Sequence, residues 1–207
     1  MAITSVRTSS ITDPQRFQSL AQATYVAPLP STIGMVLLTD YTIDHAGTSA
    51  TLTNGQVTFT GVTSLSLNGV FSADFDNYLI LIRCLGNTDI NMQLRMVASG
   101  TPATGSNYTT QEIYAVGTVV GAGRASGTIA SFQFFGSQNM NGTHLHLYGP
   151  ALAQPTAFRA VGARGTGGAQ IDELAGTHSL STSYDGLYIS ATNGNITGAL
   201  QVYGVRS

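Results

Sequence analysis

The chain has 207 residues, with eight basic and ten acidic side chains, and a formal net charge of −2 at pH 7. Charged residues make up only 9% of the sequence, against roughly 25% in an average soluble protein. All eight basic residues are Arg and they form no stripe, so nucleic acid is not an expected partner. The longest apolar runs are far shorter than the ~20 residues that cross a bilayer, so no membrane insertion is expected.

This length suits one ordinary domain, or one domain with a tail. The single cysteine, Cys84, lies in an apolar run and is expected to be a buried structural thiol. One cysteine cannot form an intrachain disulfide, so stability must come from packing or from association between copies. A surface of Thr, Ser, Asn, Gln and Gly suits a protein that packs against copies of itself and meets polysaccharide. The absence of Lys is explained equally well by a GC-rich genome.

Residues 1–34 are predicted to form an attachment arm. Asp13 is a suitable N-cap residue and Pro14 fits the first helical position, so a short helix is expected over residues 14–23. A helix of this length is marginal on its own, and its apolar stripe therefore needs a partner. The stripe, which is the candidate docking surface, consists of Phe17, Leu20 and Ala21. The two prolines that follow favour an extended segment.

Residues 35–69 are predicted to form a β-hairpin stem or linker. A short apolar strand is expected over residues 35–39. Asn54-Gly55 separates two segments that alternate with period two, and both residues tolerate the positive φ angles of a type I′ hairpin turn. A further short strand, ending at Asn68-Gly69, completes this slender section.

Residues 70–207 are predicted to form a distal antiparallel β-sandwich or jelly roll, which makes the chain all-β apart from its arm. Residues 77–85 are apolar on both faces and indicate a central strand, whereas residues 89–98 alternate between apolar and polar side chains. Further strands at about 8–12-residue spacing, with turn signals between them, are typical of a sandwich. They are expected over residues 108–116, 128–135, 143–149, 156–163, 169–175, 186–191 and 198–205.

Several short motifs in this distal region occur in a recognisable order. They are FSADFDNY at 71–78, GSNY at 105–108, TSYDG at 182–186, GNITG at 194–198 and YG at 203–204. Together they resemble the distal β-domain of bacteriophage tail and fibre proteins, often called minor tail proteins of phages that infect actinobacteria. The resemblance covers roughly residues 65–207. It implies a virion structural protein, a homotrimer, whose N-terminal arm attaches to other virion proteins and whose distal head points outward.

Metal and cofactor chemistry finds little support in the sequence, and no cofactor is expected. His144 and His146 share one face of a predicted strand and are weak metal candidates. With no Cys or carboxylate close by in the sequence, a polar outer face or a chain–chain contact is the better explanation. Asp74 and Asp76 could supply oxygens to calcium, although aspartates before a strand more often cap a turn. The cluster of Asp40, Asp44 and His45 matches no ligand loop and indicates a solvated turn.

Enzymatic activity is not expected. Asp172-Glu173 is the only adjacent carboxylate pair, but neighbouring residues on a strand point to opposite faces, whereas glycosidases need two carboxylates across one cleft. No nucleophile elbow is present. The glycine-rich segments at residues 121–124 and 165–168 do not lie between a strand and a helix, so they indicate loop tips rather than a nucleotide site.

Recognition of a host-surface glycan is the leading functional hypothesis. Sugar recognition combines aromatic faces with planar amide, carboxylate or guanidinium groups, and these types occur in or beside predicted loops. The receptor-binding candidates are Asn107, Tyr108, Arg124, Asp172, Tyr184 and Asp185. Rim packing of the tyrosines is an equally good explanation for each. The alternative function is a purely architectural capsid fibre or decoration protein without receptor binding. A third, an enzyme that trims surface polysaccharide, has the least support.

Overall fold

The computed structural model describes residues 34–88, 90–132, 140–164 and 170–206. Residues 33–207 form one compact unit. The predicted helix, with the docking candidates Phe17, Leu20 and Ala21, lies outside the described residues. Within them the fold is all-β and antiparallel, without a helix, which confirms the predicted fold class at this level.

Fourteen strands form one sheet within the described part of the chain. Their bounds are β1 Met35–Leu37, β2 Thr42–Thr53, β3 Gln56–Asn68, β4 Asn77–Gly86, β5 Met92–Ala98, β6 Thr101–Pro102, β7 Tyr108–Val116, β8 Val119–Gly127, β9 Ala130–Phe132, β10 Asn141–Tyr148, β11 Thr156–Arg164, β12 Gln170–His178, β13 Gly186–Ala191 and β14 Ile196–Val205.

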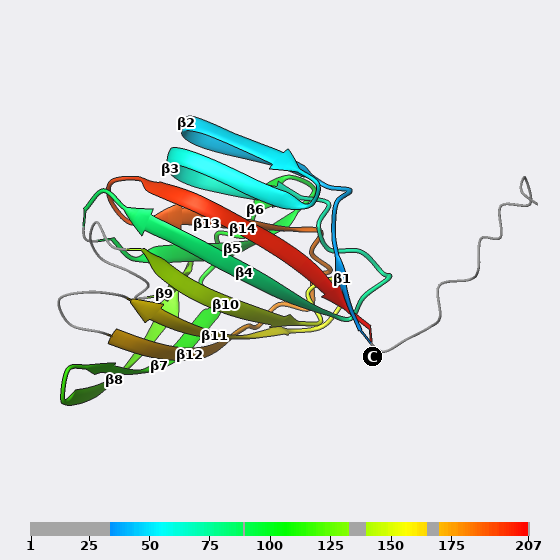
Figure 1. The fold of residues 1–207 in the computed structure, drawn as a ribbon. Coiled ribbons are helices and arrows are strands. Elements are labelled where there is room, and N and C mark those ends of the chain that lie inside the picture. Colours follow the sequence, from blue (N-terminus) through cyan, green and yellow to red (C-terminus); the bar gives the residue numbers. More distant parts are fainter. Residues whose placement is uncertain (1–33, 89, 133–139, 165–169, 207) are drawn as a thin grey trace, which may run out of the picture. The chain divides into compact units, whose positions relative to one another are not determined.

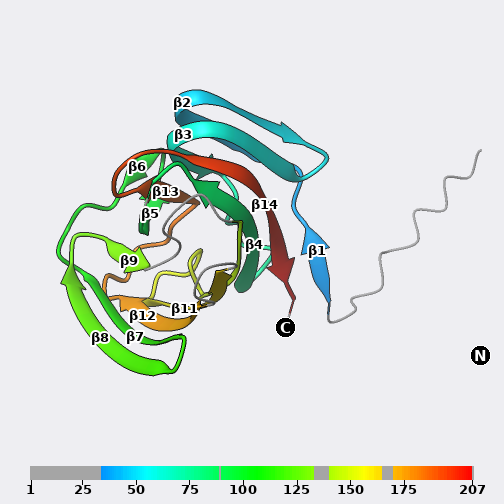
Figure 2. The same ribbon diagram turned by 60° about the vertical axis from the view of Figure 1, so that its left-hand side comes forward.

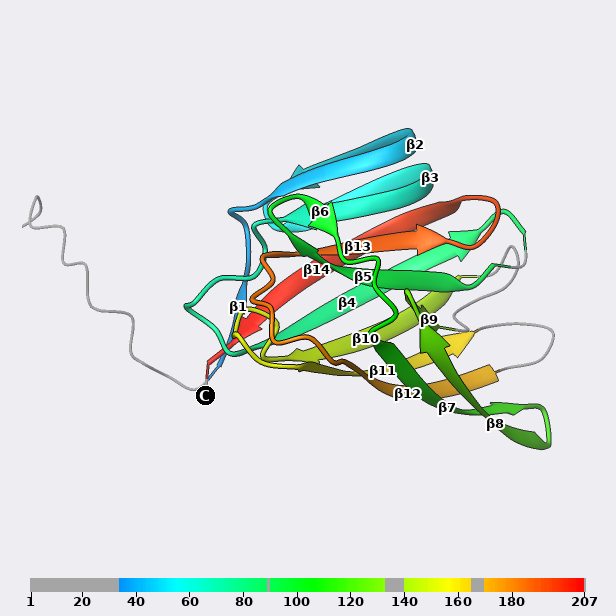
Figure 3. The ribbon, with the colours of Figure 1, turned by 180° about the vertical axis from the view of Figure 1, so that it is seen from behind.

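The sheet is strongly curled. Its main path runs β6-β5-β13-β3-β14-β4-β10-β11-β12-β7-β8, with β1 on β14, β2 on β3 and β9 on β5. The strand β9 follows β8, at one end of the path, yet pairs with β5 near the other end (Figures 1 and 2). Seen from behind, β9 lies between β5 and β8 (Figure 3). The two ends of the sheet therefore approach each other and enclose the core between them.

The core is built from the alternating residues that the strands turn inward. In β5 the inward side chains Met92, Leu94 and Met96 are buried, the apolar set that the sequence predicts for one face, and Val97 is buried as well. The strand β4 buries Ile80 and Ile82 but leaves Leu81 exposed, because its other face looks to solvent rather than to a second layer. We call the core-facing side of the sheet its inner face and the solvent side its outer face.

The hairpin between β2 and β3 turns where the sequence predicts. Asn54 and Gly55 have φ angles of 50° and 80°, the two positive values that a type I′ turn needs. A side chain at position 55 would also collide with Leu37 and Leu38. Glycine at position 55 is therefore needed for two reasons. It tolerates the positive φ angle of the turn, and its missing side chain leaves room for Leu37 and Leu38.

Residues 35–69 do not stand apart as a stem in the structure. The strand β3 lies inside the sheet between β13 and β14, and its inward side chains, among them Val57, Leu65 and Leu67, are fully buried. The alternating apolar side chains of β3, which suggested a slender hairpin, pack into the main core. Residues 33–207 accordingly form one compact unit.

The strand β8 is a second difference from the sequence prediction. The sequence predicts a loop tip at residues 121–124, but these residues lie within β8, which pairs with β7 over its whole length. A Cβ atom at Gly121 would collide with the ring of Tyr114. Glycine is therefore used here for close approach to a neighbouring side chain, not for a turn. The other predicted glycine-rich tip, residues 165–168, lies outside the described residues.

Candidate functional site

Two of the receptor-binding candidates are core residues. Tyr108 and Tyr184 are only 1% and 3% exposed, so the prediction that they lie on exposed loops is wrong. Their rings pack against the buried ring of His178, at centroid distances of 4.4 and 5.1 Å. A hydrogen bond of 3.3 Å joins Tyr184 Oη to His178 Nδ1. Both tyrosines are held by the interior and are not available to a large ligand.

Tyr108 also completes the hydrogen bonding of β5. Its hydroxyl accepts a bond from the backbone N–H of Met96 at 2.9 Å and donates one to the carbonyl of Ala103 at 3.2 Å. The neighbouring strand β6 is only two residues long and contains Pro102. The hydroxyl therefore satisfies backbone groups at the place where strand pairing ends.

Asp185 and Asn107 have structural partners in the loops that they occupy. The carboxylate of Asp185 accepts hydrogen bonds from the backbone N–H of Ser99, 3.1 Å from each oxygen. Ser99 has a φ angle of 50°, so this contact holds a tight turn. The carbonyl of Asn107 accepts a bond of 2.9 Å from the N–H of Ser179. These contacts fix loops and do not by themselves make a binding surface.

The remaining two candidates lie on opposite faces of the sheet. Asp172, on β12, is buried on the inner face and accepts a bond of 2.7 Å from the amide of Gln170. Arg124, on β8, is exposed on the outer face. Glu173 is exposed beside the buried Asp172, as predicted for neighbours on a strand. The six candidates do not converge on one site.

A different group of side chains lies together on the outer face of β10. His144, His146 and Tyr148 alternate with the buried Leu145 and Leu147, so all three rings point outward. The imidazoles stack with centroids 5.6 Å apart and an interplanar angle of 25°, and the Tyr148 ring follows 6.2 Å beyond His146. We call these three residues the β10 aromatic row.

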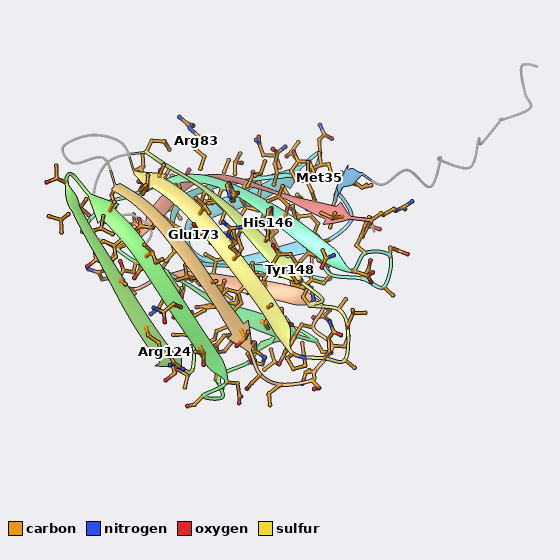
Figure 4. The ribbon with its side chains drawn as sticks, turned by 90° about the horizontal axis from the view of Figure 1, so that it is seen from below. Met35, Arg83, Arg124, His146, Tyr148 and Glu173 are labelled. Carbon is orange, nitrogen blue, oxygen red and sulfur yellow. The ribbon has the colours of Figure 1, made fainter. Side chains whose placement is uncertain are left out.

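An ion pair lies beside the row. Arg159, on β11, stands directly opposite His146, and its Nη2 and Nε lie 2.6 and 2.9 Å from Oε1 of Glu173 on β12. Figure 4 shows His146, Tyr148 and Glu173 near one another on this face, with Arg124 across it on β8. Aromatic rings, a guanidinium and a carboxylate thus share one exposed surface. The pairing of β10, β11 and β12 brings them together.

The electrostatic setting favours a neutral imidazole at His146. Partial burial is the main cause that lowers the pKa of His146 below its usual value, and the positive neighbours His144 and Arg159 lower it further. The two imidazole rings are nearly parallel and the Tyr148 ring is tilted 70° to that of His146, so the row is a weakly polar platform with one upturned ring. Such a platform can pack on the C–H face of a sugar while nearby charged groups bond its substituents.

The histidine pair of the row was a weak metal candidate in the sequence. The described residues contain no group of three or more His, Cys, Asp or Glu side chains that could hold an ion. Asp74 accepts a hydrogen bond from the hydroxyl of Ser72 at 3.2 Å in the turn before β4. Its own backbone N–H also donates to the Ser72 hydroxyl at 3.3 Å, which agrees with the turn role that the sequence favours for Asp74 over calcium binding.

An apolar patch lies on the same outer face, towards β8. Ile113, Val120 and Ile171 are 58%, 73% and 62% exposed, on the neighbouring strands β7, β8 and β12. They border a shallow depression of about 300 Å³. We call these three residues the outer apolar patch. Clustered exposed aliphatic side chains mark an interaction surface.

Sequence reasoning identified part of this surface. The alternation of His144 and His146 with leucines shows that they share a face, and Tyr148 continues the same alternation. The sequence does not reveal that Arg159 and Glu173 lie beside them, because that depends on the register of three strands. Strand pairing is set by the whole sheet and leaves no local motif.

No protein-family model and no curated protein matches the chain. Among the described residues, no helix has the length and apolar character needed to span a membrane.

Proposed function

We propose that the chain is a non-enzymatic virion structural protein whose head binds a host-surface glycan through the β10 aromatic row. The observation that carries the glycan-binding proposal is the line of three outward rings on β10, spaced at 5.6 and 6.2 Å, with the Arg159–Glu173 pair beside it. The phage origin rests on the resemblance of residues 65–207 to distal domains of tail and fibre proteins. The finer fold proposed is an antiparallel sandwich or jelly roll, formed by the two halves of the curled sheet.

The geometry suits a linear polysaccharide better than a single small molecule. Successive rings of the row are spaced much like successive sugar rings in an extended chain. The row lies on an open face, so each contact would be weak and a long ligand would touch several rings at once. Because the strand already holds the rings in line, their side chains lose little conformational entropy on binding.

The proposal includes a homotrimer attached to other virion proteins by residues 1–34. Three weak sites on one particle gain avidity, by about 10²–10⁴-fold for a dense receptor. The outer apolar patch supports association between copies, because a monomer would leave these aliphatic side chains in water. Phe17, Leu20 and Ala21 remain the docking candidates of the arm. The protein would reside in the virion.

The second candidate is a purely architectural protein, and the outer apolar patch favours it. Under this alternative the outer face packs against virion neighbours and the aromatic row has no ligand. The two functions predict different effects of changing the row. Loss of the row would leave particle assembly and adsorption intact in the architectural case.

The test is a binding assay with bacterial surface polysaccharides. A variant carrying His146→Ala and Tyr148→Ala should lose binding, because two of the three platform rings are removed, and it should keep its melting temperature. The matched control is Tyr188→Ala, a partly exposed tyrosine on β13 that belongs to another part of the sheet. Unchanged binding by the double variant would refute the proposed site, and the architectural function would then be the better one.

A further inference from the structure

The six strands β4, β10, β11, β12, β7 and β8 present an outer face whose charge differs from that of the chain. Its described charged side chains are three arginines, Arg83, Arg124 and Arg159, and one carboxylate, Glu173. The chain as a whole carries a formal charge of −2. Other described acids lie elsewhere, including Asp74 and Asp76 before β4 and Asp185 before β13. This face is therefore the positive side of a slightly acidic protein.

Two of these arginines flank the aromatic row from opposite sides. Arg159 on β11 is paired directly with His146. Arg83 on β4 is paired with Gly142, which places it diagonal to His144, at the ~7–8 Å spacing across which long side chains still meet. Both guanidinium groups belong to exposed residues. A ligand lying along the row would pass between them.

The single carboxylate of the face is engaged by one of the two arginines. Both short contacts of Arg159 reach the same oxygen, Oε1 of Glu173, at 2.6 and 2.9 Å. This ion pair holds Arg159 in position near the row. Two guanidinium groups, Arg83 and Arg159, lie around the row against the one carboxylate of Glu173, so the neighbourhood of the row keeps a positive potential, which a bound anion would relieve.

We infer that the ligand of the β10 aromatic row is an acidic polysaccharide, whose sugar carboxylates bind Arg83 and Arg159 while its rings pack on His144, His146 and Tyr148. This inference rests on the proposed glycan-binding function and specifies the class of glycan. Carboxylates suit guanidinium groups because the two planar groups can form paired, charge-assisted hydrogen bonds. A nucleic acid fits less well, since its phosphate backbone calls for a denser track of cations.

The inference predicts how binding depends on pH. The groups that face His146 are His144 and Tyr148 on its own strand, Arg159 on β11 with Glu173 behind it, and Asn77, Leu79 and Leu81 on β4. A bound anion among these groups stabilises the protonated form of the His146 imidazole, so the protein takes up protons when it binds an acidic glycan. Its affinity should rise as pH falls from about 7.5 towards 6. A neutral glycan gains nothing from the added charge.

The experiment compares acidic polysaccharides with neutral forms of the same backbone. The panel includes polygalacturonate and its fully methyl-esterified form, together with bacterial acidic polysaccharides and their carboxyl-reduced forms. The protein should bind at least one acidic member about tenfold more tightly than its neutral form, and the difference should shrink as salt is added. The thermal melting curve of each variant checks that it is folded.

Three variants separate a specific site from general attraction. Arg83→Gln combined with Arg159→Gln should weaken acidic-glycan binding at least about tenfold. Arg124→Gln removes the same type of charge from the same face, three strands away from Arg159, and should change binding by less than about twofold. Glu173→Gln removes the negative group, so it should strengthen binding.

The outcomes are distinguishable. Equal binding of acidic and neutral forms would overturn this inference and leave the proposed function intact. Equal losses from Arg124→Gln and from the flanking pair would also overturn it, because attraction would then be diffuse. Tighter binding of a single-stranded oligonucleotide than of any polysaccharide would reject the ligand class. Binding to no member of the panel would contradict the proposed function itself.

Discussion

Replacing Tyr108 with Phe removes one hydroxyl from the interior and should lower the free energy of unfolding by about 2–4 kcal/mol. The ring itself keeps its place, because Tyr108 is 1% exposed and packs against His178 in an edge-to-face arrangement with centroids 4.4 Å apart. What is lost is the bond accepted from the Met96 N–H at 2.9 Å and the one donated to the Ala103 carbonyl at 3.2 Å. Both backbone groups would be left without that partner.

The two bonds contribute separately. The buried N–H of Met96, left unsatisfied, costs about 1–3 kcal/mol, and the lost bond to the part-buried Ala103 carbonyl costs about 1 kcal/mol. For a domain of 150–250 residues, 1 kcal/mol shifts the melting temperature by about 2–4 °C, so a fall of about 4–16 °C is expected.

Calorimetry and urea unfolding measure this change, and Tyr148→Phe is the matched control. Tyr148 is an exposed tyrosine on the outer face of β10, so its stability effect should stay within about 0.5 kcal/mol. The Tyr108 variant, assayed below its melting temperature, should still bind glycan. A melting temperature unchanged by Tyr108→Phe, together with lost binding, would refute the structural role and return Tyr108 to the receptor site.

Three further predictions concern acid stability, assembly and attachment. Burial lowers the pKa of His178 below the usual 6.5, so the unfolded chain binds a proton at this residue more readily than the folded chain does. The free energy of unfolding should therefore be highest above about pH 6.5 and should fall as the pH drops below it. Urea unfolding at a series of pH values measures this change. If the fall persists unchanged in His178→Gln, another group causes it. Val120→Asp with Ile171→Asp places charges on the outer apolar patch and should dissociate the trimer, as native mass spectrometry or analytical ultracentrifugation would show; a trimer that survives excludes the patch as its interface. Phe17→Ser with Leu20→Ser removes about 3–6 kcal/mol of apolar burial and should abolish incorporation into particles, and normal incorporation would reject docking through this stripe.

Local patterns in the sequence predicted the strands well. Asn54-Gly55 specifies its turn through backbone angles that few residues adopt. The inward set Met92, Leu94 and Met96 follows from period-two alternation, which is a property of one strand alone. The opposite orientation of Asp172 and Glu173 follows from the same rule. These features need no knowledge of the partner strands.

The errors arose where a residue's environment depends on distant parts of the sheet. Tyr108 and Tyr184 follow Gly- and Ser-rich segments that signal loops. Tyr108 nevertheless begins β7, Tyr184 lies just before β13, and both rings turn inward onto His178. The glycines of β8 look like a loop tip, but Gly121 makes room for Tyr114 on the neighbouring strand. The place of Arg159 beside His146 depends on strand register, which the whole curled sheet determines.

The most direct test of glycan binding by the β10 aromatic row is an NMR titration of its ring signals. Acidic oligosaccharides that bind the protein are added stepwise while the imidazole and phenol resonances are followed. If the row binds the glycan, the signals of His144, His146 and Tyr148 shift together and saturate at one ligand concentration, while those of the buried His178 do not move. Saturable shifts confined to the loops around Asn107 and Asp185, with the row unaffected, would contradict it.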